Sequence, residues 1–244
     1  MHILRSRERE DPRRRVLLRA LAAGLFSGGA IPGLTIAQSV LGDRPARLPA
    51  DRSIYRVFGD VQVNGKPASL QTRIEAADTV RTGRDGEIVY VIGENAFIQR
   101  RDSEVAFDGG RSAVLDGLRI VTGALLSVFA PGRPLRLSTQ TATIGIRGTG
   151  VYVEAEPQRT YFCTCYGVAD VAATNDSQSK ETVKATHHDN PLYILAGEPL
   201  GRNVRRAPFI NHTDQELMMI EALVGREPPF DFPKDSYRAP RREY

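Results

Sequence analysis

The chain has no tryptophan, only two cysteines and three methionines among its 244 residues. It also lacks the local signatures of common catalytic sites. There is no G-x-S-x-G, no H-E-x-x-H, no P-loop and no G-x-G-x-x-G. Long amphipathic helical patterns are scarce. A hydrophobic content of 41% suits one ordinary globular domain with tails. Without a catalytic motif, we expect a protein that is not an enzyme.

Excess charge is also missing from most of the chain. The formal net charge is +4, but residues 1–37 hold seven arginines and three acidic residues, and the remaining 26 basic and 26 acidic residues balance. The basic pI of about 9.2 therefore comes from the N-terminal segment. This distribution argues against nucleic-acid binding by the folded part.

The N-terminal segment has the order of an export signal. Residues 1–15 are polar and arginine-rich, and residues 20–37 are weakly apolar and rich in glycine. The run Arg13–Arg19 is similar to the twin-arginine consensus, with Leu17 where phenylalanine is usual. We expect export to the periplasm and cleavage near Ala37. The alternative is an uncleaved membrane anchor, and the segment is also expected to contact the membrane transiently.

Short strand patterns dominate the chain after a proline- and arginine-rich lead-in at 38–53. Apolar runs recur at intervals of roughly 8–12 residues and are separated by turn residues. This spacing predicts an all-β fold, a short-stranded β-roll or solenoid-like sandwich. The β domain is expected at 54–200. Its predicted strands cover residues 57–63 with a turn at Gly59-Asp60, 77–83, 87–92, 96–100, 103–107, 118–121, 124–129, 135–137, 141–153, 161–167 and 168–172, with a polar loop at 174–180 and a further strand from about 182.

One short helix is expected in the C-terminal region, 201–225. Thr213 and Glu216 form a capping-box pattern before an apolar face, which predicts a helix over 213–224 that packs on the β domain. Residues 226–244 are rich in proline, aromatic residues and arginine, and we expect them to form a surface tail.

The stretch 141–153, TATIGIRGTGVYV, is the most distinctive pattern. Small polar and branched apolar residues alternate, as in a half-buried strand. The alternation breaks at Gly148-Thr149-Gly150 and resumes at Val151. Glycines within such a run mark a bulge or a sharp bend.

The same stretch resembles the signature strand of FecR-domain proteins, a family of bacterial envelope sensors. The resemblance extends over about residues 55–175 and is carried most closely by Gly145, Arg147, Gly148 and Thr149. It implies an all-β, non-catalytic sensing or interaction module with an envelope protein as partner. Family sensors begin with a cytoplasmic anti-sigma segment, whereas here only about a dozen residues precede the twin-arginine-like motif. Direct control of a sigma factor therefore does not follow from the resemblance.

Chemistry-bearing side chains are concentrated in one window. Both cysteines, Cys163 and Cys165, lie on a predicted strand, where residues two apart point to the same face. His187 and His188 follow on a later strand, where only one of the two can face the thiols. His212, before the helix, is another candidate ligand.

Three interpretations of these residues remain open. Two thiolates and one or two imidazoles suit a zinc or copper site, or a haem-type ligand site. A disulfide or redox pair is the second, although extended residues two apart lie at the upper limit of disulfide spacing. The third is purely structural, since buried thiols and surface histidines often only pack. The ordinary FecR pattern requires neither pair, so this feature is a departure from it.

Overall fold

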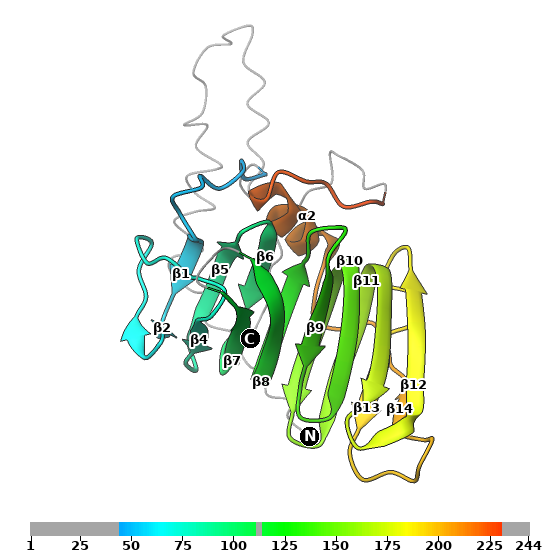
Figure 1. The fold of residues 1–244 in the computed structure, drawn as a ribbon. Helices are drawn as coiled ribbons and strands as arrows, with labels where there is room; N and C mark the ends of the chain where they lie inside the picture. Colours follow the sequence, from blue (N-terminus) through cyan, green and yellow to red (C-terminus); the bar gives the residue numbers. More distant parts are fainter. Residues whose placement is uncertain (1–43, 111–113, 231–244) are drawn as a thin grey trace, which may run out of the picture. The chain divides into compact units, whose positions relative to one another are not determined.

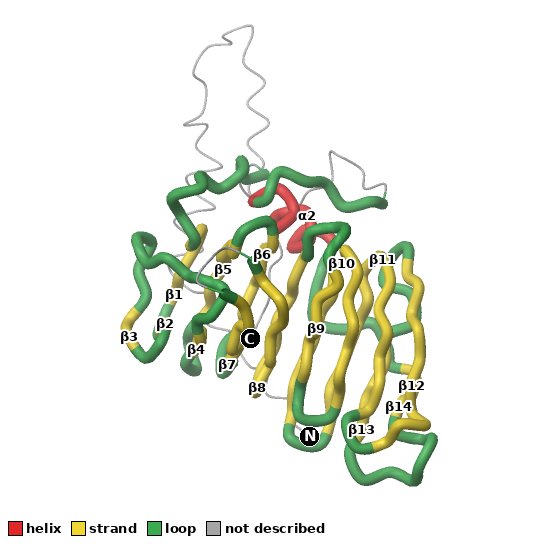
Figure 2. Tube along the Cα trace, in the orientation of Figure 1, coloured by secondary structure: helices red, strands yellow, loops and turns green. Residues whose placement is uncertain are grey.

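The computed structural model describes residues 44–110 and 114–230, so the predicted export signal at 1–37 and residues 231–244 of the predicted tail lie outside the described residues. The described chain forms a 14-stranded mixed sheet and one helix, which confirms the all-β prediction (Figure 1). Figure 2 shows the same arrangement, with α2 as the helical segment among the residues that the structure describes. The elements are β1 Ile54–Phe58, β2 Val61–Val63, β3 Lys66–Pro67, β4 Thr79–Thr82, β5 Glu87–Ile92, β6 Asn95–Gln99, β7 Glu104–Gly109, β8 Leu115–Val128, β9 Pro134–Ser138, β10 Ala142–Glu156, β11 Arg159–Ala173, β12 Asp176–Ala185, β13 Leu192–Leu195, β14 Val204–Arg206 and α2 Asp214–Leu223.

Three long strands each contribute to two layers of the sheet. The first half of β8 pairs with β7 and β9, and its second half pairs with β6 and β10. The first half of β10 pairs with β9. The first half of β11 pairs with β13, and its second half pairs with β12. One layer therefore contains β2, β4, β7, β9 and β12, the other contains β1, β5, β6, β13 and β14, and the long strands connect them.

Glycines in left-handed conformations mark the bends of these strands. Gly123 in β8 has a φ of 86°, Gly148 in β10 has 56° and Gly167 in β11 has 94°. A Cβ at Gly167 would lie 2.4 Å from Cγ2 of Thr149, so a side chain is excluded there by contact as well as by backbone conformation. The pairing register shifts between Arg147 and Gly150, which confirms the bend predicted in the signature strand.

The bends also explain two incorrect strand boundaries. The sequence predicts separate strands at 118–121 and 124–129, and again at 161–167 and 168–172. In the structure, each of these pairs lies in one continuous strand. Glycine ends a strand only if pairing stops there, and here a partner in the other layer continues the ladder.

The expected polar loop at 174–180 is also wrong, because β12 already starts at Asp176. Its sequence is polar because the strand pairs with β11 along one edge and exposes alternate residues to solvent, while Ser179 and Val183 are buried.

Alternating residues of the second layer face two separate cores. One row across β6, β8, β10 and β11 consists of Gln99, Leu125, Val153 and Phe162, which face the inner core between the layers. The adjacent row consists of Ile98, Leu126, Tyr152 and Cys163, which face a second core under α2. We call this second cluster the helix-side core. The cysteine strand thus forms part of the wall between the two cores.

Helix α2 begins at the predicted capping box. The Thr213 hydroxyl accepts from the backbone N–H of Glu216, and the Glu216 carboxylate accepts from the backbone N–H of Thr213. Leu217, Ile220 and Leu223 are buried in the helix-side core, as the apolar face predicts. None of the helices in residues 44–110 and 114–230 has the length and hydropathy needed to cross a membrane.

Polar contacts also fasten the helix to the sheet. The buried guanidinium of Arg100 forms an ion pair with Glu216, and the Tyr166 hydroxyl donates to Glu221. In the predicted lead-in, Leu48 is buried and its N–H donates to the carbonyl of Leu223 at 2.9 Å.

Candidate metal centre

The two cysteines lie side by side on the first half of β11. Both are fully buried, both belong to the helix-side core, and they form no disulfide. Thr164 between them points to the opposite face, since its strand partner Val151 belongs to the inner core. Cys163 pairs with Tyr152, whereas the register shift between Gly150 and Val151 leaves Cys165 without a partner on β10. Both thiols nevertheless belong to the helix-side core, as the strand periodicity predicted.

His188 is brought to the thiols by the turn after β12. Its backbone N–H donates to the carbonyl of Cys165 at 2.8 Å, which fixes the turn against the cysteine strand. The residue has a φ of 55°, a left-handed conformation that turns the chain at this point. The Nδ1 atom of its ring lies 3.7 Å from the sulfur of Cys163.

His212 reaches the same position from the segment that precedes α2. It is buried, and its ring stacks on Tyr152 with centroids 4.5 Å apart. Its Nε2 atom lies 3.1 Å from Nδ1 of His188. The ligand atoms of Cys163, Cys165, His188 and His212 all lie within 4.8 Å of one another. Three separate segments thus converge on a Cys₂His₂ group, which we call the buried centre.

Hydrogen bonds outside the buried centre fix which ring nitrogens carry hydrogen. His212 Nδ1 lies 2.7 Å from the carbonyl oxygen of Ile210, and His188 Nε2 lies 2.8 Å from Oδ1 of Asp214. A carbonyl and a carboxylate only accept, so both of these nitrogens are donors. When the rings are neutral, His188 Nδ1 and His212 Nε2 therefore direct lone pairs at each other and at Cys163. A thiol proton, an imidazolium proton or a metal ion between these atoms would satisfy the facing lone pairs.

The electrostatics of the thiols are strongly asymmetric. A hydrogen bond from Cys165, reinforced by His188 and His212, lowers the pKa of Cys163 to about 4. Burial and the neighbouring Cys163 thiolate raise the pKa of Cys165. Burial alone would lower the pKa of His188, but its bonds to Asp214 and Cys163 outweigh that effect and raise it to about 9. Without a metal, these shifts favour a Cys163 thiolate beside a His188 imidazolium.

His187 does not face the thiols. Its side chain is 48% exposed, and its Nε2 atom lies 2.9 Å from the same Asp214 oxygen that accepts from His188. Of the two neighbouring histidines, the structure therefore brings only His188 to the cysteines. His187, His188 and Asp214 form a second, outer group whose ligand atoms also lie within 4.8 Å of one another.

The signature residues do not line the buried centre. Gly145 and Arg147 lie on β10, where Arg147 forms an exposed ion pair with Asp170 at 2.8 Å. Gly148 and Thr149 form the bend, and Thr149 is fully buried. These residues shape the strand that pairs with the cysteine strand, which is a scaffold role.

Sequence reasoning missed Asp214 and the carbonyl of Ile210. No local pattern marks a residue that orients a ligand from another segment. The one available signal was the position of Asp214 in the first turn of the helix. An acidic residue there is already explained by its favourable interaction with the helix dipole.

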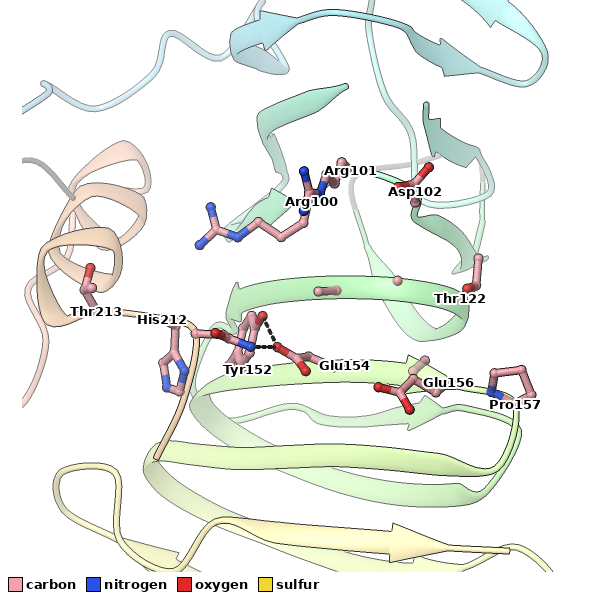
Figure 3. Close-up of a pocket in the computed structure, with 14 residues that line it drawn as sticks. Arg100, Arg101, Asp102, Thr122, Tyr152, Glu154, Glu156, Pro157, His212 and Thr213 are labelled. Carbon is pink, nitrogen blue, oxygen red and sulfur yellow. Dashed lines mark hydrogen bonds between the residues drawn. The ribbon is translucent and has the colours of Figure 1, made fainter. Parts of the chain in front are cut away.

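A pocket of about 740 Å³, lined by both polar and apolar groups, lies beside His212. Figure 3 shows Tyr152 beside His212, with Glu154 accepting from the Tyr152 hydroxyl at 2.7 Å. The Asn211 amide donates to the same Glu154 oxygen at 2.7 Å. At His212 the pocket is therefore lined by the stacked rings of Tyr152 and His212 and by a carboxylate that already accepts two hydrogen bonds.

Comparison with known proteins gives limited similarity. No family profile and no curated protein matches the chain. Two solved structures of a candidate anti-sigma factor from Parabacteroides distasonis are similar over 53% of this chain, with TM-scores of 0.42 and identities of 9% and 10%. The matched region spans 58% of the length of those structures.

Proposed function

We propose that this protein is a non-catalytic sensing module of the bacterial envelope that binds one Zn²⁺ or Cu⁺ ion through Cys163, Cys165, His188 and His212. The observation that carries the proposal is the convergence of these four ligand atoms within 4.8 Å in a buried position. Two thiolates and two imidazoles are the ligand set of tetrahedral structural zinc sites, and thiolate is also a preferred ligand of Cu⁺.

The surroundings of the histidines support the proposal. Metal-binding histidines usually donate their second ring N–H to a carboxylate or a carbonyl, which fixes the tautomer that can bind. His188 donates to Asp214 and His212 donates to Ile210, so each ring offers its bare nitrogen to the centre. An ion there would also replace the proton that the facing nitrogens otherwise need.

The position of the ligands supports a sensing role. The cysteines belong to the sheet, whereas His212 belongs to the segment leading into α2. An ion bound by both would connect the C-terminal helix to the sheet, so that ion binding is transmitted to the outer surface of the helix. An envelope protein that recognises this surface is the proposed partner.

The non-catalytic role and the periplasmic location rest on sequence. The chain lacks catalytic motifs, the stretch 141–153 resembles the FecR signature, and residues 1–37 have the order of an export signal. An exported protein needs to protect a thiol pair from oxidation, and ion binding would do so.

Titration of the metal-free protein against a chromophoric chelator tests the proposal. We expect one equivalent of Zn²⁺ or Cu⁺ per chain, with no tight binding in the Cys163→Ser/Cys165→Ser variant. Thr164→Val is the matched control, because it changes the residue between the cysteines on the opposite face of the strand. The proposal is wrong if the folded wild-type protein binds neither ion more tightly than the double variant.

A thiol-redox pair is the second candidate. It is favoured by the contact of Cys163 with His188 and by the closeness of the two sulfurs. Complete burial of both sulfurs counts against it, because an oxidant must reach the thiolate. Thiol counting after mild oxidation separates the candidates. A redox pair loses both thiols whether or not metal ion is added before oxidation. A metal centre retains both thiols when the ion has been added.

A further inference from the structure

We propose that His187 and Asp214 form the access site through which the metal ion reaches the buried centre. This inference rests on the proposed function and adds a route to it. The site would take a hydrated divalent or monovalent cation from solution, hold it briefly, and pass it to the thiolates. His187 would therefore control the rate of loading and have little effect on the final affinity.

A continuous series of ligand atoms joins the surface to the thiols. His187 Nε2 lies 2.9 Å from Oδ1 of Asp214, the same oxygen lies 2.8 Å from His188 Nε2, and His188 Nδ1 lies 3.7 Å from the sulfur of Cys163. Side-chain exposure falls along this series from 48% at His187 through 19% at Asp214 to 9% at His188. The cysteine at its end is fully buried.

Aromatic rings cover the flanks of this route. Phe209 packs on His188 and His212 with ring centroids 4.5 and 4.6 Å away. Phe230 packs on His187 at 4.5 Å and lies 6.4 Å from His188. A hydrated cation gains nothing from crossing these apolar faces. The carboxylate of Asp214, which bonds to both His187 and His188, is the polar approach, and its negative charge attracts a cation.

The large pocket beside His212 is a less suitable route. Tyr152 stacks on the ring of His212, and Oε1 of Glu154 already accepts from Tyr152 and Asn211 (Figure 3). An ion on that side meets ring faces, whereas both ring nitrogens of His212 are directed elsewhere, at Ile210 and at His188.

Transfer requires only ligand exchange and proton movement. The ion first binds Asp214 and Nε2 of His187, whose proton then sits on Nδ1. It next moves to Nδ1 of His188 and the sulfur of Cys163. The protons held by the thiols and by Nδ1 of His188 leave to water as the ion binds these atoms. Asp214 regains the hydrogen bond from His188 once the ion has passed, which restores the orientation of that ring.

Stopped-flow loading with Co²⁺, a spectroscopic substitute for Zn²⁺, tests this route. Absorption from thiolate-to-cobalt charge transfer appears only when the ion reaches the sulfurs, so it reports arrival at the buried centre. We expect His187→Ala to slow this step by about tenfold, because the access site loses one of its two transient ligands and loss of a metal-site partner weakens binding by about 10–100-fold. The Co²⁺ affinity measured at equilibrium should stay within about twofold of wild type, because His187 is not a ligand in the final centre.

Glu154→Gln is the matched control on the pocket side and should load at the wild-type rate. The access proposal fails if His187→Ala loads as fast as wild type, or if Glu154→Gln is the slow variant. It also fails if wild type binds two ions and His187→Ala binds one, since the outer group is then a second resident site. A wild-type protein that shows no thiolate–cobalt absorption contradicts the proposed function instead.

Discussion

Replacement of Gly167 by alanine should destabilise the fold by about 2–5 kcal/mol. Gly167 bends β11 two residues after Cys165, where the strand leaves the layer under α2 and pairs with β12. Its φ of 94° lies in the left-handed range, which costs an L-residue about 1–2 kcal/mol. The new Cβ would also lie 2.4 Å from Cγ2 of Thr149 and 3.0 Å from the carbonyl oxygen of Gly148. Overpacking of this kind costs about 1–3 kcal/mol.

Gly65→Ala is the matched control because it isolates the steric contribution. Gly65 also has a positive φ, 75°, but no atom lies within 4 Å of a Cβ placed there. This variant should therefore lose only the conformational contribution of about 1–2 kcal/mol.

Urea unfolding measures both variants. With a slope of about 2 kcal/mol per molar, an extra loss of about 2 kcal/mol lowers the midpoint of Gly167→Ala by about 1 M relative to Gly65→Ala. Equal midpoints for the two variants would refute the argument that contact with Thr149, rather than backbone conformation alone, requires glycine at the bend.

Three further predictions concern the cap of α2, the carboxylate of Asp176 and the bound ion. Thr213→Ala removes the helix cap and should cost about 1 kcal/mol in urea unfolding, whereas an unchanged midpoint would show that the cap contributes nothing. Hydrogen bonds from Ser179, Asn203 and backbone N–H groups hold the pKa of Asp176 well below its usual range. Their contribution is present above the unfolded-state pKa of about 3.9 and is lost as pH falls through the lower folded value, so the difference in Tm between wild type and Asp176→Asn should shrink from pH 7 to pH 3. A constant difference would contradict this assignment. At a free ion concentration of about 100 times the Kd, bound ion should add about 2.7 kcal/mol to the free energy of unfolding. Chelation should therefore lower the Tm by roughly 5–10 °C, and an unchanged Tm would argue against binding to the folded state.

Local patterns predicted several elements closely. The capping box at Thr213 and Glu216 placed the helix within a residue of its observed bounds, because the cap and the apolar face are both short-range features. Alternation placed both cysteines on one strand face for the same reason. The glycine break in the signature strand became the bend at Gly148.

Features that depend on distant partners were not predictable in this way. Gly123 and Gly167 resemble strand ends in sequence, and only pairing across layers shows that they are bends. Periodicity indicated that one of His187 and His188 faces the thiols, but the choice depends on the left-handed turn at His188. The approach of His212 to the cysteines depends on how α2 docks, which no local pattern specifies.

Elemental analysis of the purified protein, with thiol counting on the same sample, tests the central claim most directly. The account predicts close to one equivalent of zinc or copper per chain, two thiols protected until the ion is removed, and loss of the metal in Cys163→Ser/Cys165→Ser. Native protein that is metal-free, takes up neither ion, and keeps the same stability in the double variant would contradict it.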